Sequence, residues 1–166
     1  MDIVQEKIYY QSPIGCIEII GNADGLQSVK RIEGECQSDD TNVSIVLTHC
    51  KQQLEEYFSR QRTTFDIKIN WQSATDFNVS VWKALLEIPY GHTCSYSNIA
   101  NKIENPAAVR AVGLANKHNP IAIIVPCHRV IGKNGDLTGY FYGLDVKRKL
   151  LELENPMSFA QQGSLF

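Results

Sequence analysis

The sequence predicts an α+β protein in which a small sheet with one helix precedes a mostly helical domain. Short runs rich in β-branched and aromatic residues alternate with turn residues near the N-terminus, which is typical of strands. Farther along, apolar residues recur at helical spacing. A length of 166 residues suits one domain or two small ones, and the pattern changes around residues 70–76. We therefore expect domains over residues 1–73 and 74–156, with a tail over 157–166.

The first domain is predicted to contain a meander, a helix and a further strand. Its strands are expected over residues 7–11, 16–21, 26–32 and 65–69. The turns Ser12-Pro13-Ile14-Gly15 and 21–25 separate the first three. A helix through residues 47–58 follows the cap-like Asp40-Thr41-Asn42. This half has no dense cluster of catalytic residue types, so we expect it to be a scaffold.

The second domain is predicted to begin with a helix capped by Thr75 and to contain a helix–turn–helix. Ser95 is placed to cap a helix over residues 96–103, and Asn105-Pro106 to start a second one that ends near Lys117. Small residues line this second helix, which indicates close approach to a surface, either another helix or a ligand. They are Ala107, Ala108, Ala111, Gly113 and Ala115. A last helix is expected over residues 145–154.

Composition and charge are those of a soluble globular protein, with 43% hydrophobic and 20% charged residues. The net charge of −2 divides into −4 for residues 1–75 and +2 for residues 76–166. If the chain binds DNA, the second half is expected to bind it. The sequence has no stretch of membrane-spanning length and no signal-peptide pattern at its N-terminus. We expect a cytoplasmic protein.

The chain has five cysteines, an odd number spread along the sequence: Cys16, Cys36, Cys50, Cys94 and Cys127. This distribution argues against a disulfide framework and favours a reducing compartment. Without a C-x-x-C pair a zinc ribbon is disfavoured. Cys16, Cys36, His49 and Cys50 are an alternative metal-ligand set, although isolated buried cysteines are the favoured interpretation.

The candidate nucleophile lies in the run Val125-Pro126-Cys127-His128-Arg129-Val130-Ile131. An apolar segment, residues 121–125, ends in proline and presents a thiol that a histidine follows directly. Sulfur attacks as thiolate, and a neighbouring base or a helix N-terminus can promote that ionisation. Taken alone, the Cys–His pair fits a transfer nucleophile, a cysteine hydrolase or half of a metal site.

The residues around this run resemble the O6-alkylguanine-DNA alkyltransferases, also called methylated-DNA–protein-cysteine methyltransferases. The resemblance is carried by Pro126 to Val130, by residues 81–85, 88–91 and 95–96, and by segments farther along. These are Asn105-Pro106, residues 110–113, Asn119-Pro120, Gly139-Tyr140, Gly143-Leu144 and 147–151. It implies a ribonuclease H-like first domain and a winged helix–turn–helix second domain. It also implies direct reversal of O6-alkylguanine damage, chiefly O6-methylguanine, with O4-methylthymine as a further candidate substrate.

By this resemblance, Cys127 accepts the alkyl group in an in-line displacement. His128 removes the thiol proton through a water molecule, and Glu154 orients His128, as in a triad. On spacing alone, Glu154 would be a solvated acid at a helix end. Asn119 corresponds to a hinge residue between the recognition helix and the active-site segment. Tyr96 corresponds to the acid that protonates the leaving guanine and lies beside the rotated phosphate.

The resemblance also implies that the damaged base is flipped out of double-stranded DNA through the minor groove. Arg110 would enter the stack in its place, and Ala111, Gly113 and Ala115 would let the helix lie close to the groove. The carbonyls of Cys127 and Val130, together with Tyr140, would recognise the guanine edge, and the Phe141 N–H would meet O6. The aromatic pair Phe141-Tyr142 predicts a narrow alkyl pocket that favours methyl over benzyl groups.

The product would be a thioether on Cys127, and the site contains no means to hydrolyse it. We therefore expect one turnover per molecule, no cofactor, no metal and a monomeric protein. Three alternatives remain: a lesion-signalling module, a cysteine hydrolase and a transcription factor that uses the helix–turn–helix. The first would lack the acceptor cysteine, and adjacent residues seldom point at each other as a hydrolase pair requires.

The last five residues, Gln162 to Phe166, form a separate signal. They resemble the short peptide by which bacterial replication and repair proteins dock on the DNA sliding clamp. Their Leu and Phe would anchor an extended tail in a hydrophobic groove. A frayed terminus explains the same residues equally well.

Overall fold

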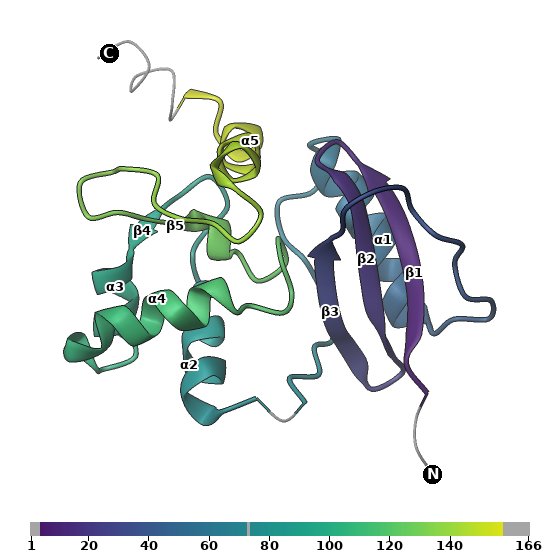
Figure 1. The fold of residues 1–166 in the computed structure, drawn as a ribbon, viewed down its shortest axis with the longest axis horizontal. Coiled ribbons are helices and arrows are strands. Elements are labelled where there is room, and N and C mark those ends of the chain that lie inside the picture. Colours follow the sequence, from purple (N-terminus) through teal and green to yellow (C-terminus); the bar gives the residue numbers. More distant parts are fainter. Residues whose placement is uncertain (1–3, 73, 158–166) are drawn as a thin grey trace. The chain divides into compact units, whose positions relative to one another are not determined.

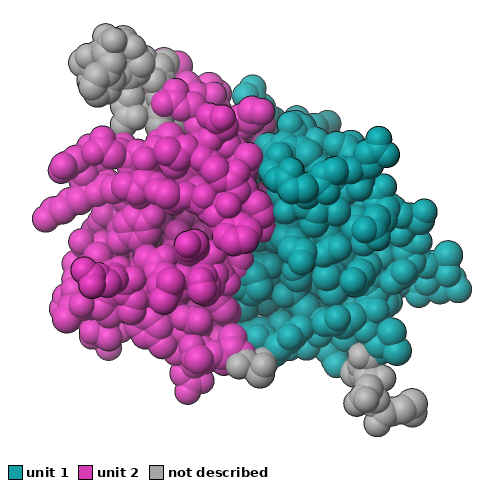
Figure 2. Space-filling view, in the orientation of Figure 1, with its two compact units in different colours: residues 1–73, 120–122 teal, residues 74–119, 123–166 magenta. Residues whose placement is uncertain are grey.

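The fold is that of a computed structural model, which describes residues 4–72 and 74–157. The described chain divides into two compact units (Figure 2). One comprises residues 1–73 with Pro120–Ala122, and the other comprises residues 74–119 and 123–166. Sequence alone assigned residues 120–122 to the second domain. They group with the first because Val29 of its sheet pairs with Ile121.

The first unit is built on an antiparallel meander of three strands, β1 (Glu6–Ser12), β2 (Gly15–Asn22) and β3 (Gly25–Arg31), in the order β1-β2-β3. Helix α1 (Ile45–Phe58) packs across one face of this sheet (Figure 1). Alternation along the strands turns Ile8, Ile17 and Ile19 inward, where they meet Leu47, Leu54 and Tyr57 of the helix layer. The meander and the helix confirm the α+β prediction for this half.

Two local predictions for this unit are wrong. Residues 65–69 form no strand, since their pairing is a single bridge between Ile69 and Leu26. Asp40 to Asn42 do not cap α1, which begins after Ser44. The Asp40 carboxylate instead accepts a hydrogen bond of 2.9 Å from the backbone N–H of Lys7. The Asp40 carboxylate is therefore bound to Lys7 of strand β1 and does not cap helix α1.

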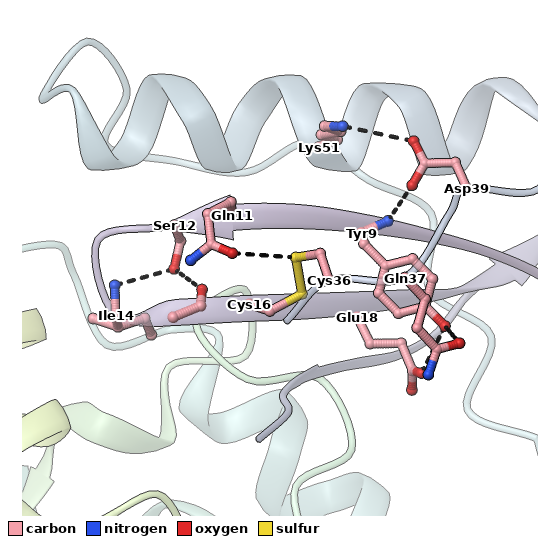
Figure 3. The surroundings of a disulfide bond; sticks show 11 residues. Tyr9, Gln11, Ser12, Ile14, Cys16, Glu18, Cys36, Gln37, Asp39 and Lys51 are labelled. Carbon is pink, nitrogen blue, oxygen red and sulfur yellow. Dashed lines mark hydrogen bonds and ion pairs between the residues drawn. A yellow bond between two sulfur atoms is a disulfide. The ribbon is translucent and has the colours of Figure 1, made fainter. Parts of the chain in front are cut away.

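The expectation that the chain has no disulfide is also wrong, because Cys16 and Cys36 are bonded to each other (Figure 3). The bond fastens the segment between β3 and α1 to strand β2. Asp39 of the same segment accepts a 2.8 Å hydrogen bond from the Tyr9 backbone N–H and pairs with Lys51 at 3.7 Å. Residues 36–40 thus cover β1, which would otherwise be an open sheet edge. Because both sulfurs are in the disulfide, Cys16 and Cys36 are not available as metal ligands, which rules out the alternative metal-ligand set that included them.

Among the residues that the structure describes, the second unit contains four α-helices, two short 3-10 turns and a two-residue parallel pair. Its elements are α2 (Asp76–Leu85), β4 (Cys94–Ser95), α3 (Tyr96–Lys102), η1 (Pro106–Ala108), α4 (Val109–Lys117), η2 (Cys127–Arg129), β5 (Val130–Ile131) and α5 (Leu144–Glu154). Within the described ranges, no helix is long and apolar enough to cross a membrane.

Local capping chemistry sets the starts of α2 and α3 as predicted. The Thr75 side chain accepts a hydrogen bond from the Asn78 N–H, and Ser95 forms a reciprocal capping box with Asn98. Asn105 makes no such bond. The chain there first forms the 3-10 turn η1, so α4 begins at Val109 rather than at Pro106. Helices α3 and α4 pack against each other and form the helix–turn–helix.

Candidate active site

The candidate nucleophile lies on a 3-10 turn that is held from the end of α4. Cys127 begins this turn, η2, and its residue is 5% exposed. The Asn119 side-chain amide donates to the Val125 carbonyl at 2.8 Å, and that of Asn116 donates to the Cys127 carbonyl at 3.3 Å. Ile123, just before this segment, adopts a left-handed φ of 73°, which is strained for a β-branched residue. The turn is therefore fixed by side chains on both sides of the thiol.

His128 and Glu154 form a fully buried pair. The Nε2 atom of His128 lies 2.6 Å from Oε2 of Glu154, and neither side chain has exposed surface. Because Glu154 is a carboxylate, Nε2 carries the proton and donates it. Nδ1 then bears the lone pair, and it has no hydrogen-bond partner among the described residues. The geometry thus leaves His128 with one nitrogen oriented by the acid and the other free to accept a proton.

Glu154 is held by Arg129 and Gly91 as well as by His128. Arg129 donates to both carboxylate oxygens, at 2.8 and 3.2 Å, and the Gly91 backbone N–H donates at 3.3 Å. Burial acts to raise the pKa of Glu154, but its contacts with His128 and Arg129 outweigh burial and hold that pKa at about 2. The carboxylate is therefore charged throughout the physiological range.

The same environment keeps His128 neutral. Burial lowers its pKa most strongly, Glu154 acts in the opposite direction, and the positive charges of Arg129 and Lys147 lower the pKa further. A neutral imidazole with a free Nδ1 is a competent base. For the thiol, burial raises the pKa of Cys127, whereas hydrogen bonding by Asn119 and Tyr140 and the charge of Lys147 act to lower it. The thiolate consequently needs both a base and nearby positive charge.

Tyr96 lies at the first turn of α3 and is half-buried. Its hydroxyl accepts a 3.1 Å hydrogen bond from the Thr138 hydroxyl. Its ring lies beside Gly113 of α4, where an added Cβ would stand 3.9 Å from the nearest ring atom. Tyr96 therefore joins the helix–turn–helix to the loop of residues 132–143.

The predicted base-pocket residues fall into two groups. Val130 is buried, and Tyr140 is partly buried with its hydroxyl oxygen inside the protein. Tyr142 packs edge-on against Tyr140, with ring centroids 5.6 Å apart, and against Phe141 at 5.1 Å. Phe141 itself is 66% exposed. Tyr142, one of the two aromatic residues expected to narrow the pocket, thus contacts the ring of Tyr140, whose side chain hydrogen-bonds with Cys127.

The predicted DNA-facing residues also divide. Arg110 and Ala111 are exposed on α4, and Gly113 is half-buried. Ala115 is a correction, since it is 2% exposed and its carbonyl accepts a hydrogen bond from the Trp82 indole at 2.9 Å. The small side chain of Ala115 therefore serves packing between α4 and α2, and it is not available to a groove.

Sequence reasoning missed three buried polar residues at this site: Asn116, Arg129 and Lys147. Arg129 directly follows His128, and apolar residues flank the two on both sides, which is a signal of a buried ion pair. Lys147 lies three residues before Leu150 and seven before Glu154, and so falls on the buried face of α5. Because Arg148 and Lys149 follow it directly, Lys147 resembles part of an exposed basic run in the sequence.

Comparison with known proteins identifies the family. Residues 76–156 match the DNA-binding domain of 6-O-methylguanine DNA methyltransferase, and residues 7–71 match its ribonuclease-like domain. The chain is 50% identical over 154 residues to the methylated-DNA–protein-cysteine methyltransferase of Methanosarcina barkeri, which covers 89% of this chain and 97% of the relative. A crystal structure of the Mycobacterium tuberculosis O6-methylguanine methyltransferase superposes with a TM-score of 0.82 at 45% identity, covering 92% and 94% of the two chains.

A second crystal structure of the M. tuberculosis protein, in complex with DNA, has a TM-score of 0.81 at 46% identity and covers 93% of this chain and 94% of that one. These matches extend over both units and include the turn that presents Cys127 beside His128 and Glu154. The chain therefore belongs to the 6-O-methylguanine DNA methyltransferase family, the methylated-DNA–protein-cysteine methyltransferases.

Proposed function

We propose that this chain flips O6-alkylguanine out of duplex DNA and transfers the alkyl group irreversibly to Cys127. The observation that carries the residue assignment is the 2.6 Å pairing of His128 Nε2 with Glu154, which leaves Nδ1 as the accepting atom. A base oriented in this way, directly after a buried thiol, is the arrangement that nucleophilic transfer requires.

The reaction balances with groups of this chain and the substrate. The Cys127 thiol proton passes through a water molecule to Nδ1 of His128, and the thiolate attacks the alkyl carbon. The carbon–O6 bond breaks, and its electron pair stays on guanine, which takes a proton from the Tyr96 hydroxyl. The resulting phenolate is reprotonated by solvent, and His128 returns its proton to solvent. The thioether on Cys127 has no leaving group, so each molecule reacts once and needs no cofactor.

DNA is proposed to bind through the minor groove along α4. Arg110 is exposed at the first turn of that helix, and we expect it to fill the space that the flipped base leaves. Ala111 and Gly113 would allow the helix to approach the backbone closely. Arg110→Ala is expected to slow transfer from duplex DNA while leaving transfer from the free base O6-methylguanine unchanged. Equal losses on both substrates would contradict a role in flipping.

The base pocket is proposed to use the carbonyls of Cys127 and Val130, the Tyr140 side chain and the Phe141 N–H. Because Phe141 is exposed, restriction of the alkyl group falls to Tyr142. We expect methyl transfer to be much faster than benzyl transfer, and we expect Tyr142→Ala to reduce the ratio of the two rates. Similar methyl and benzyl rates in the unmodified protein would remove the basis for this proposal.

The tail peptide Gln162 to Phe166 lies outside the described residues, and its docking on a sliding clamp stays a prediction. Deleting residues 162–166 should abolish co-purification with the clamp and spare transfer on short duplexes. The protein is proposed to act as a monomer, because its three site side chains and the helix–turn–helix all come from one chain. A DNA substrate implies the compartment that holds the chromosome, which agrees with the expected cytoplasmic location.

The central test is the intact mass of the protein after incubation with a duplex that carries one O6-methylguanine. A gain of one methyl group that Cys127→Ala abolishes is the expected result. Lesion-selective binding without a mass gain would indicate a signalling module instead. An absence of binding would overturn the DNA assignment.

A further inference from the structure

The loop of residues 132–143 brings a hydroxyl to the side chain of Tyr96. Oγ1 of Thr138 lies 3.1 Å from the Tyr96 hydroxyl oxygen, and both residues are half-buried. The two residues are 42 positions apart in the sequence, so the fold rather than the local sequence creates this contact. The hydroxyl of Thr138 is a group that the proposed reaction has not yet used.

The pairing of β4 with β5 places the start of this loop beside Tyr96. Ser95 of β4 lies opposite Ile131 of β5 in the parallel pair, and the loop follows Ile131 directly. The Ser95 side chain also accepts a hydrogen bond from the Asn98 N–H and so caps α3, whose first residue is Tyr96. The backbone of Tyr96 is therefore fixed on one side by the cap and on the other by the strand pair.

Thr138 is held in place by a tight turn within the loop. The Gly132 N–H donates to the Asp136 carbonyl at 2.8 Å, and the Gly135 N–H donates to the Gly132 carbonyl at 2.9 Å. The Thr138 methyl group packs against Gly132, where an added Cβ would stand only 3.1 Å from it. With its methyl group packed in this way, Thr138 presents its hydroxyl to Tyr96.

We propose that Thr138 is a positioning residue for the departure of guanine, which donates a hydrogen bond to the Tyr96 oxygen as Tyr96 gives its proton to the base. This inference rests on the proposed function. Tyr96 has a single hydroxyl hydrogen, and once guanine takes it the oxygen can only accept. Thr138 keeps its own proton and solvent reprotonates the phenolate, so the balance of the reaction is unchanged.

The hydrogen bond should strengthen as the reaction proceeds. Before the transfer the Tyr96 oxygen is neutral, and the contact is a bond between two hydroxyl groups. Negative charge develops on that oxygen as its proton leaves, and hydrogen bonds to a charged acceptor are roughly twice as strong as neutral ones. An interaction that is stronger in the transition state than in the substrate complex raises the rate of the chemical step. Thr138 therefore favours the loss of the Tyr96 proton to the leaving base.

The test compares two substitutions of Thr138 that separate its hydroxyl from its shape. Thr138→Val keeps the branched shape and removes the hydroxyl, whereas Thr138→Ser, the matched control, keeps the hydroxyl and removes the methyl group. Single-turnover methyl transfer and binding are measured with a duplex that carries one O6-methylguanine. Alkylation of Cys127 by iodoacetamide is measured in parallel, because iodide leaves without a proton and needs no acid.

For Thr138→Val we expect methyl transfer from the duplex to fall about tenfold, the effect of losing one hydrogen bond to a charged group. Thr138→Ser should recover most of the rate. Alkylation by iodoacetamide and affinity for the duplex should match those of the unmodified protein in both variants. A folded Thr138→Val that transfers the methyl group at the unmodified rate would overturn the inference. An equal loss in the iodoacetamide reaction would also overturn it, since the effect would then lie at the thiol.

A double-mutant cycle with Tyr96→Phe tests whether Thr138 acts through the tyrosine. Tyr96→Phe has no oxygen to accept the bond, so adding Thr138→Val to it should cause no further loss of transfer. The same fractional loss in both backgrounds would refute the link. If Thr138→Val does not fold, Thr138→Ala removes the same hydroxyl without adding volume and takes its place in the cycle.

The outcome for the unmodified protein separates this inference from the proposed function. If the unmodified protein fails to transfer the methyl group from the duplex, the proposed function itself is wrong. If it transfers the group and Tyr96→Phe does so equally fast, alkyl transfer to Cys127 stands, and the role of Thr138 through Tyr96 is refuted.

Discussion

Replacing Glu154 with glutamine should destabilise the second unit strongly and in a pH-dependent manner. The substitution keeps the shape of the side chain and removes its charge. Arg129 would then remain buried with its 2.7 Å hydrogen bond to the Ile88 carbonyl and its contact with the Tyr90 ring, but without an anion. Removing one partner of a buried ion pair costs about 3–5 kcal/mol.

The pKa of Glu154 gives a second value for this loss of folding stability. Its pKa falls from 4.5 to about 2 in the folded protein, which corresponds to about 3 kcal/mol of stability. Because the folded pKa is the lower one, this contribution is complete above about pH 4.5 and is lost as the pH falls toward 2. Glu154→Gln should therefore be less stable by about 3 kcal/mol at pH 7, with a melting temperature about 6–12 °C lower.

Urea unfolding at several pH values between 7 and 2.5 measures this effect. The control is Glu152→Gln on the same helix, since Glu152 is 45% exposed and pairs with Arg148 at only 4.0 Å. Its effect should stay within about 0.5 kcal/mol. Equal stability of Glu154→Gln and the unmodified protein at pH 7, or a difference that does not shrink at low pH, would refute the reasoning.

Three further predictions concern features away from the thiol. Cys36→Ser should lower the stability of the first unit by about 3 kcal/mol, because the disulfide closes a loop with a sequence separation of 20. Adding reductant to the unmodified protein should lower its thermal stability by the same amount. A thermal melt of the unmodified protein that reductant does not change would contradict this prediction. Gly113→Ala should stabilise α4 by up to about 1 kcal/mol, since the added Cβ fits 3.9 Å from the Tyr96 ring. If α4 approaches DNA as proposed, the same variant should bind DNA more weakly in titrations despite its higher stability. Thr75→Ala should cost about 1 kcal/mol in urea unfolding through loss of the 3.2 Å cap to Asn78, and no change would mean that the cap does not start α2.

The parts of the fold that the sequence predicts well are those decided by near neighbours. The caps at Thr75 and Ser95 each act within three residues, so short-range chemistry determines them. Asp40 looked equally like a cap, but its carboxylate reaches Lys7, which is distant in sequence. The disulfide was missed for the same reason, because two widely spaced cysteines say nothing about the sheet that brings them together.

The active-site residues likewise divide into those that the local sequence identifies and those that it does not. Cys127 and His128 are adjacent, so the local motif identifies them as a reactive pair. Glu154 was assigned only through family resemblance, since spacing alone cannot show that α5 folds back on η2. Lys147 was missed because the run Lys147-Arg148-Lys149 has the composition of a solvated surface. The helical spacing of Lys147 from Leu150 sets it apart from the other two charges, and the structure shows that it alone of the three is buried.

The pairing of residues 120–122 with β3 bears on whether the two units are separable modules. Val29 donates to the Pro120 carbonyl at 2.9 Å and accepts from the Ala122 N–H at 2.9 Å, so this short segment belongs to the first unit. The chain therefore passes between the units three times, and the last passage comes only a few residues before the thiol. Cleavage between residues 73 and 74 would leave the C-terminal fragment carrying a piece of the other unit's sheet without its partner strand. An exchange of domains between relatives would have to transplant residues 120–122 together with β3.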